Sequence, residues 1–160
     1  LSARHFRSSR LVERIVALLE RHAVAPESIR IEITERVLLD NPERVRKTLH
    51  QMRQSGIGVS LDDFGTGYSS LSYLHQFPID TLKIDRSFVA NLRADDRGST
   101  PVVRAIKALA DSQNLQVIAE GIETKQQAGT LQKLDCQYGQ GFLYAEPQPA
   151  EAWIADRQTA

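Results

Sequence analysis

The chain has 160 residues, of which 41% are hydrophobic and 25% are charged, a composition typical of one ordinary globular domain. Twenty basic residues balance twenty acidic ones, so net charge gives no reason to expect binding to a nucleic-acid polymer or an anionic membrane. No apolar run approaches the length of about 18 residues that predicts a transmembrane helix, so we expect no membrane insertion. A single cysteine, Cys136, excludes an intrachain disulfide and favours a cytoplasmic protein.

Helical and extended patterns alternate along the chain. Helices are indicated by apolar residues three and four positions apart, and strands by short apolar or alternating runs. In chain order, the patterns predict a helix over residues 9–22, a strand over 29–34, a helix that begins at Pro42 and ends before Gly56, strands over 57–61 and 81–84, a helix that begins at Thr100, a strand over 116–119, a helix capped by Thr124, and a weaker strand over 136–143. Residues 93–99, with two aspartates and a glycine, predict an exposed loop.

This alternation predicts an α/β fold with a parallel sheet, either a doubly wound open sheet or a (β/α)8 barrel. Acidic or polar residues stand at the carboxyl ends of the five strands: Glu32, Asp62, Asp63, Lys83, Glu120 and Gln140. The mouth of a barrel brings such residues together, whereas an open sheet concentrates its site at one switch point. We therefore favour the (β/α)8 barrel of the TIM type.

Four of these residues are carboxylates: Glu32, Asp62, Asp63 and Glu120. Carboxylates around one cavity repel each other unless cations neutralise them. Their oxygens favour hard ions such as Mg²⁺ or Mn²⁺, and two ions suit the hydrolysis of a phosphodiester. We therefore expect these four residues to be the metal ligands of a two-ion site.

Lys83 is expected to orient the attacking water or to stabilise the negative charge that develops. The alternative, a Schiff-base lysine, requires a lowered pKa, and acidic neighbours act in the opposite direction. The segment that follows Asp62 contains Gly65 and Gly67, which permit unusual backbone angles. Two interpretations of it stay open: a loop that closes over a substrate, or a tight connection between a strand and a helix.

Five segments in chain order resemble the successive motifs of EAL domains, the bacterial family of cyclic di-GMP phosphodiesterases. They are residues 31–35 (IEITE), 62–71 (DDFGTGYSSL), 82–89 (LKIDRSFV), 117–124 (VIAEGIET) and 140–143 (QGFL). Residues 1–6 (LSARHF) resemble the segment that begins with a metal-binding Asn in that family. Residues 1–160 are accordingly expected to be one EAL domain that lacks its N-terminal strands.

The resemblance implies hydrolysis of cyclic di-GMP to linear pGpG with two Mg²⁺ or Mn²⁺ ions. By motif position, Glu32, Asp62 and Glu120 would be metal ligands, and Asp63 would bind the second ion or bridge the pair. Lys83 would hold the attacking water. The remaining predicted site residues are the supporting Glu123 and Gln140, the loop anchor Glu35, and the substrate loop Phe64, Gly65, Thr66, Gly67, Tyr68 and Ser69.

The resemblance also implies a homodimer and fusion to upstream sensor or cyclase-like domains. The glutamate-alanine-leucine signature is absent, together with its ligand Glu, the Arg near it and the Asn ligand, and about 80–100 upstream residues are expected to supply them because a full barrel needs about 250. Residues 145–149 (AEPQP) replace the family's usual Arg-Pro-Leu-Pro ending. The isolated chain is expected to be inactive, and the alternatives to an enzyme are an inactive cyclic di-GMP receptor and a dimerisation module.

Overall fold

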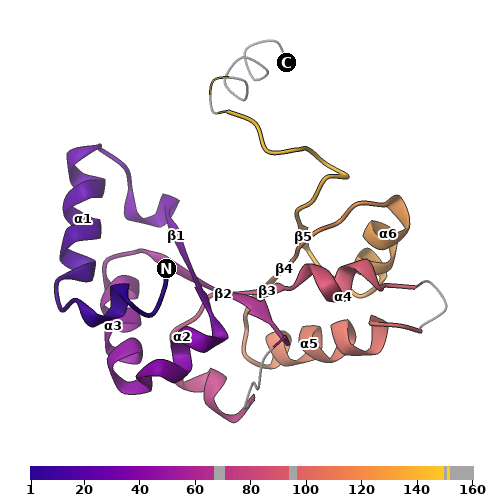
Figure 1. Cartoon of the computed structure of the whole chain (residues 1–160), viewed down its shortest axis with the longest axis horizontal. Helices are drawn as coiled ribbons and strands as arrows, with labels where there is room; N and C mark the ends of the chain where they lie inside the picture. Colours follow the sequence, from indigo (N-terminus) through magenta and orange to yellow (C-terminus); the bar gives the residue numbers. More distant parts are fainter. Residues whose placement is uncertain (67–70, 94–96, 150, 152–160) are drawn as a thin grey trace.

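The computed structural model describes residues 1–66, 71–93, 97–149 and 151 (Figure 1). Its centre is a five-stranded sheet in which neighbouring strands follow the order of the chain. The strands are β1 (Arg30–Thr34), β2 (Gly58–Phe64), β3 (Thr81–Ile84), β4 (Gln116–Ala119) and β5 (Tyr138–Gly139). All four pairings are parallel. This order has no reversal, so the sheet lacks the switch point of a doubly wound fold and has the sequential winding of a barrel.

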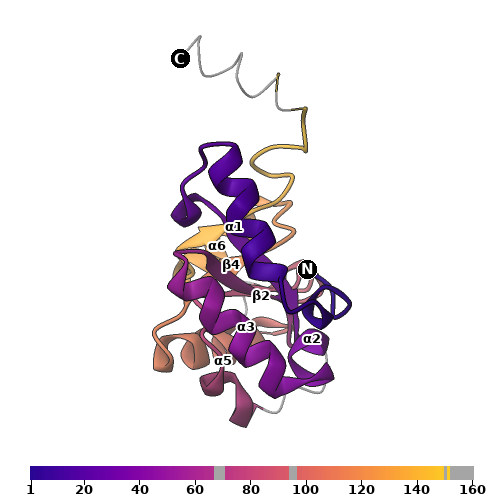
Figure 2. The same cartoon turned by 90° about the vertical axis from the view of Figure 1, so that its left-hand side faces the viewer.

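The helices are α1 (Leu11–Arg21), α2 (Glu35–Asp40), α3 (Pro42–Gln54), α4 (Arg86–Ala90), α5 (Thr100–Ser112) and α6 (Lys125–Lys133). Figure 1 shows the strands along a curve, with α1, α3, α5 and α6 following one another around its outer side. Seen from the side in Figure 2, α1 and α3 lie in front of the sheet. Within the described residues, no helix combines the length and the apolar character needed to cross a membrane.

The two faces of the sheet differ in chemistry because successive side chains of a strand point to opposite faces. One set of alternate residues is apolar and buried in the core with the helices: Val59, Leu61, Leu82, Ile84, Val117 and Ala119. The other set is mostly polar: Arg30, Glu32, Ser60, Asp62, Thr81, Lys83 and Gln116. The helices therefore cover the apolar face, and the polar set faces the inner side of the curve, where a barrel carries its site.

Most of the predicted elements are confirmed, and their caps explain where they begin. The Asn41 side chain accepts a hydrogen bond from Arg44 N at 3.1 Å at the start of α3. Thr124 and Gln127 form the predicted capping box of α6. Residues 93–99 are non-helical where the structure describes them, but residues 94–96 lie outside the described part.

Three details differ from the sequence-based prediction. Helix α2, of six residues, directly follows β1, and helix α4, of five residues, follows β3 after Asp85; neither was predicted. They are too short to show a helical apolar period. The strand predicted over residues 57–61 extends to Phe64, whereas the strand predicted over 136–143 pairs with the sheet only at Tyr138 and Gly139.

Candidate active site

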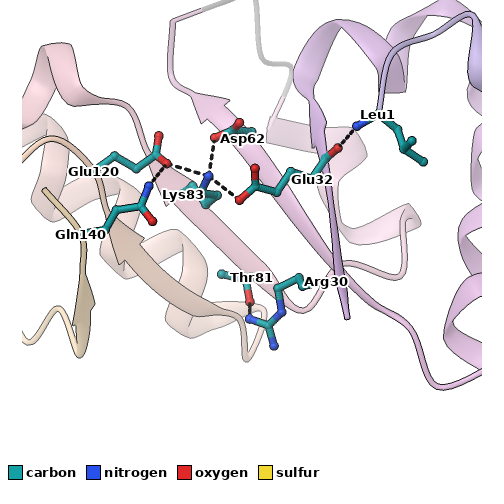
Figure 3. A network of polar contacts seen from close by, with 8 residues as sticks. All are labelled: Leu1, Arg30, Glu32, Asp62, Thr81, Lys83, Glu120 and Gln140. Carbon is teal, nitrogen blue, oxygen red and sulfur yellow. Dashed lines mark hydrogen bonds and ion pairs between the residues drawn. The ribbon is translucent and has the colours of Figure 1, made fainter. Parts of the chain in front are cut away.

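Lys83 is the centre of the polar network on the inner face of the sheet (Figure 3). Its Nζ lies 2.6 Å from Glu32 Oε1, 3.2 Å from Asp62 Oδ1 and 2.6 Å from Glu120 Oε1. These partners come from β1, β2 and the residue after β4, so one ammonium group on β3 joins side chains from four neighbouring strands. Gln140 extends the network because its Nε2 donates to Glu120 Oε1 at 2.7 Å.

Lys83 is only 4% exposed, and the surrounding charges decide its protonation state. Burial opposes its positive charge, but the hydrogen bonds to Glu120 and Glu32 outweigh burial and raise the pKa of Lys83 above its ordinary value. Lys83 is therefore an ammonium group throughout the physiological range. This protonation excludes the Schiff-base role, which requires a neutral amine.

Three carboxylates form a cluster beside Lys83. Oxygens of Asp62, Asp63 and Glu120 all lie within 4.8 Å of one another. Burial raises the pKa of Glu120 and, together with the neighbouring Asp62 charge, that of Asp63. Such crowding of negative charge favours a bound cation, and hard oxygen donors fit Mg²⁺ or Mn²⁺. The sequence-predicted ligand Glu32 is not within this cluster and is joined to it through Lys83.

The backbone turns sharply at the acidic pair. Asp63 has a φ of +53°, in the left-handed region that residues other than glycine rarely adopt. Since the turn interrupts the alternation of a strand, the Asp63 carboxylate reaches the same cluster as its neighbour Asp62 instead of the opposite face. A strained backbone at a cluster of functional groups is a common feature of active sites.

A cavity of about 600 Å³ adjoins the cluster and contains other predicted site residues. Its lining includes Asp63, Glu120, Glu123 and Gln140. The same cavity is also lined by residues that were not among the predicted site residues, including Asp85, Arg86, Phe142, Glu146 and Pro147. The signal for the first two was present in the sequence, since Asp85 and Arg86 directly follow the strand that carries Lys83.

Arg86 reaches the cavity past Gly121. A Cβ atom on Gly121 would lie 2.6 Å from Arg86 Cβ, and its φ is +69°. Only glycine combines this backbone conformation with so close an approach. Gly121, one residue after Glu120, therefore permits the contact between α4 and the end of β4.

Glu35 occupies the predicted anchoring position at the start of α2. Its Oε1 accepts a hydrogen bond from Gly65 N at 2.8 Å, which ties α2 to the chain directly after β2. Of the predicted substrate loop, Phe64 is the last residue of β2 and is 3% exposed in the core, so its side chain is not on the open surface. Thr66 Oγ1 donates to Asp63 O at 2.8 Å. Gly67, Tyr68 and Ser69 lie outside the described residues.

The family model of the EAL domain matches residues 1–147. The chain belongs to the EAL domain family. The family predicted from the five motifs is thus confirmed, and the acidic cluster and Lys83 lie on the EAL motif segments.

Individual EAL proteins show the same relationship. Over 155 residues the chain is 42% identical to the bifunctional diguanylate cyclase/cyclic di-GMP phosphodiesterase MucR of Pseudomonas aeruginosa. The matched residues are 97% of this chain and 22% of MucR. It matches the solved EAL domain of Mycobacterium smegmatis DcpA with a TM-score of 0.92 and 40% identity, over 99% of this chain and 71% of that one. The manganese and cyclic di-GMP complex of Klebsiella pneumoniae BlrP1 matches with a TM-score of 0.80 and 28% identity, over 89% of this chain and 36% of that one.

These likenesses decide between the two predicted architectures. EAL domains have TIM-barrel-like folds, so the barrel prediction is confirmed, with this chain forming part of such an EAL domain. The chain spans about a fifth of the length of the curated relatives it matches. The structures of BlrP1 contain calcium or manganese together with cyclic di-GMP.

Proposed function

We propose that this EAL chain carries most of the active site of a phosphodiesterase that hydrolyses cyclic di-GMP to linear pGpG with two Mg²⁺ or Mn²⁺ ions. The observation that carries the proposal is the cluster of Asp62, Asp63 and Glu120 oxygens within 4.8 Å beside the Lys83 ammonium group. Relatives named as cyclic di-GMP phosphodiesterases support the substrate. The paired aspartates support a second ion. Asp62 can bind the first ion, which leaves the neighbouring Asp63 carboxylate available to the second ion or to both.

Each residue has a role that follows from its place. Glu32, Asp62 and Glu120 would hold one ion, and Asp63 would hold the second ion or serve both. When bound, the ions supply Lewis-acid activation of water and of the phosphate. Lys83 donates hydrogen bonds to the attacking water and offsets negative charge that develops on the phosphate. Gln140 fixes the Glu120 carboxylate, and Glu123 lines the cavity in which the water network would lie.

The wider assembly is also part of the proposal. We propose that residues 1–160 form part of one EAL domain within a longer cytoplasmic protein, joined to sensor or cyclase-like domains and acting as a homodimer. The names of two relatives support a multidomain context: a bifunctional cyclase/phosphodiesterase and the oxygen sensor protein DosP of Escherichia coli.

The direct test is hydrolysis of cyclic di-GMP by the full-length protein. We expect pGpG to form with Mg²⁺ or Mn²⁺, and we expect activity to disappear after exhaustive chelation and to return when either ion is restored, because the ligands are hard oxygens. Separation of the nucleotides by liquid chromatography measures both compounds. Full activity after chelation would contradict the metal requirement, and binding of cyclic di-GMP without turnover would indicate a receptor.

Substitution of Glu35 tests the anchor of the loop. We expect Glu35→Ala to lower kcat/KM for cyclic di-GMP roughly tenfold while Mn²⁺ affinity is retained, because the lost acceptor frees Gly65 N without removing a ligand. Glu35→Gln keeps an acceptor oxygen at the same reach and should retain most of the activity. If the two variants had the same kinetics as wild type, the anchoring role of Glu35 would be wrong.

A further inference from the structure

A second polar contact crosses the inner face of the sheet below Lys83. Arg30, the first residue of β1, donates from Nη1 to Thr81 Oγ1 on β3 and to Gln116 Oε1 on β4, the latter at 3.2 Å. Figure 3 shows the Arg30–Thr81 contact beneath the network of Lys83. One guanidinium group therefore joins β1 to two strands with which its backbone makes no ladder pairing.

Gly58 makes this reach possible. It is the register partner of Arg30 on β2, the strand between β1 and β3. A Cβ atom on Gly58 would lie 3.2 Å from Arg30 Nε, closer than ordinary van der Waals contact. The absence of a side chain at this point leaves room for the arginine to pass over β2, and a glycine in a strand often marks such a close approach.

The residues of this contact lie directly below residues of the proposed site. Arg30 precedes Glu32 by two positions on β1, and Thr81 precedes Lys83 by two positions on β3. Two residues of a strand span about 7 Å and return to the same face. Movement of Arg30 relative to Thr81 would thus be transmitted to the pair formed by Glu32 and Lys83, whose contact is 2.6 Å.

The anchor of the contact on β3 belongs to a strand that is held on both of its sides. Thr81 is 0% exposed, in a strand that pairs with both β2 and β4. A contact that ties Arg30 to Thr81 therefore couples β1 to a strand with two backbone neighbours.

We propose that Arg30 is a positioning residue, which passes over Gly58 to Thr81 and Gln116 and thereby sets the distance of Glu32 from Lys83 and the acidic cluster. The proposal rests on the proposed function, because it assigns Arg30 an effect on the same metal site. It adds a residue outside the five EAL motif segments, at the end of the strands opposite the site.

The test compares Mn²⁺ affinity by calorimetry, together with kcat and KM, for the full-length protein and its variants. We expect Arg30→Met to weaken Mn²⁺ binding roughly tenfold and to lower kcat with little change in KM, as when the partner behind a metal ligand is removed. Arg30→Lys, which keeps a donor, should recover part of the loss. Met and Lys have nearly the length of Arg, so these variants keep most of the side-chain volume and are expected to fold.

Two further variants separate a specific contact from a general effect. Gly58→Ala should reproduce the loss in Mn²⁺ affinity without changing the residue at position 30, because the added methyl group displaces the arginine side chain. Combining it with Arg30→Met should add little to the loss, because both substitutions remove the same interaction. Arg53→Met is the matched control: Arg53 lines the same cavity of about 520 Å³ as Arg30, and its removal should leave the metal site unchanged.

The outcomes are distinct. Unchanged Mn²⁺ affinity and kcat in Arg30→Met would overturn the positioning role even if its melting temperature fell, since that would show a purely structural contact. An equal loss in Arg53→Met would also overturn it, by assigning the effect to net charge. Mn²⁺ binding without hydrolysis by the wild type would refute only the enzymatic function, whereas a wild type that binds no Mn²⁺ would refute both proposals.

Discussion

Substitution of Glu120 by Gln is expected to remove Mn²⁺ binding at the acidic cluster and to lower kcat for cyclic di-GMP by more than about a hundredfold, since even residues behind metal ligands contribute about 10–100-fold. Glu120 lies within the cluster of oxygens, and its Oε1 is 2.6 Å from Lys83 Nζ. Gln has the same shape but no negative charge, so the change removes the property that attracts the ion. Calorimetric titration with Mn²⁺ and steady-state kinetics measure the two effects.

The matched control is Glu123→Gln, a second glutamate of the same cavity. Glu123 lies three residues after Glu120 and is not a member of the acidic cluster found among the described residues. Its variant should retain Mn²⁺ binding and lose less turnover than Glu120→Gln. Retained Mn²⁺ affinity in Glu120→Gln would show that Glu120 is not a ligand.

Which residues meet in the site could be predicted largely because of a property of parallel sheets. The carboxyl ends of parallel strands lie at one edge, so Asp62, Lys83 and Glu120 could be expected to meet from their positions at strand ends alone. The apolar alternation that locates the strands is a local signal, so strands can be recognised even in a sequence that covers only part of a domain. For the same reason Asp85 and Arg86, which follow the strand that carries Lys83, could have been included.

Other features depend on contacts that the sequence does not display. The left-handed conformation of Asp63 is set by the turn that follows β2, and no local pattern indicates which of two adjacent aspartates adopts it. The contact of Arg30 with Thr81 depends on strand order and register together with the space above Gly58. Helix α2 has no apolar period to recognise within six residues, although it carries Glu35 to Gly65.

The two polar layers of the inner face explain how several carboxylates can lie close together in the site. Glu32, Asp62 and Glu120 surround one ammonium group, which reduces their mutual repulsion. One layer below, the Arg30 contact links three strands without a carboxylate partner in the contact itself. The upper layer therefore carries the chemistry, while the lower layer fixes the strands that present it.

The second large effect is expected from Lys83→Met, which should lower kcat about 10²–10³-fold, the loss typical of one preorganised electrostatic donor. Mn²⁺ should nevertheless bind at least as tightly as in wild type. Lys83 Nζ lies 2.6 Å from Glu120 Oε1 and 2.6 Å from Glu32 Oε1, so the ammonium group and a cation compete for the same oxygens and repel each other. A large loss of turnover with undiminished metal affinity distinguishes Lys83 from the ligand Glu120.

Lys107 provides the matched control for Lys83, because it is also a buried lysine held by carboxylates. It is 6% exposed on α5, and its Nζ lies 2.7 Å from Asp111 Oδ1 on the outer side of the sheet. Lys107→Met should lower the melting temperature but change neither kcat nor Mn²⁺ affinity, which shows that the loss of a buried ammonium group alone does not impair the site. Unchanged turnover in Lys83→Met would exclude Lys83 from the mechanism, and loss of Mn²⁺ binding would mean that its charge organises the ligands instead of competing for them.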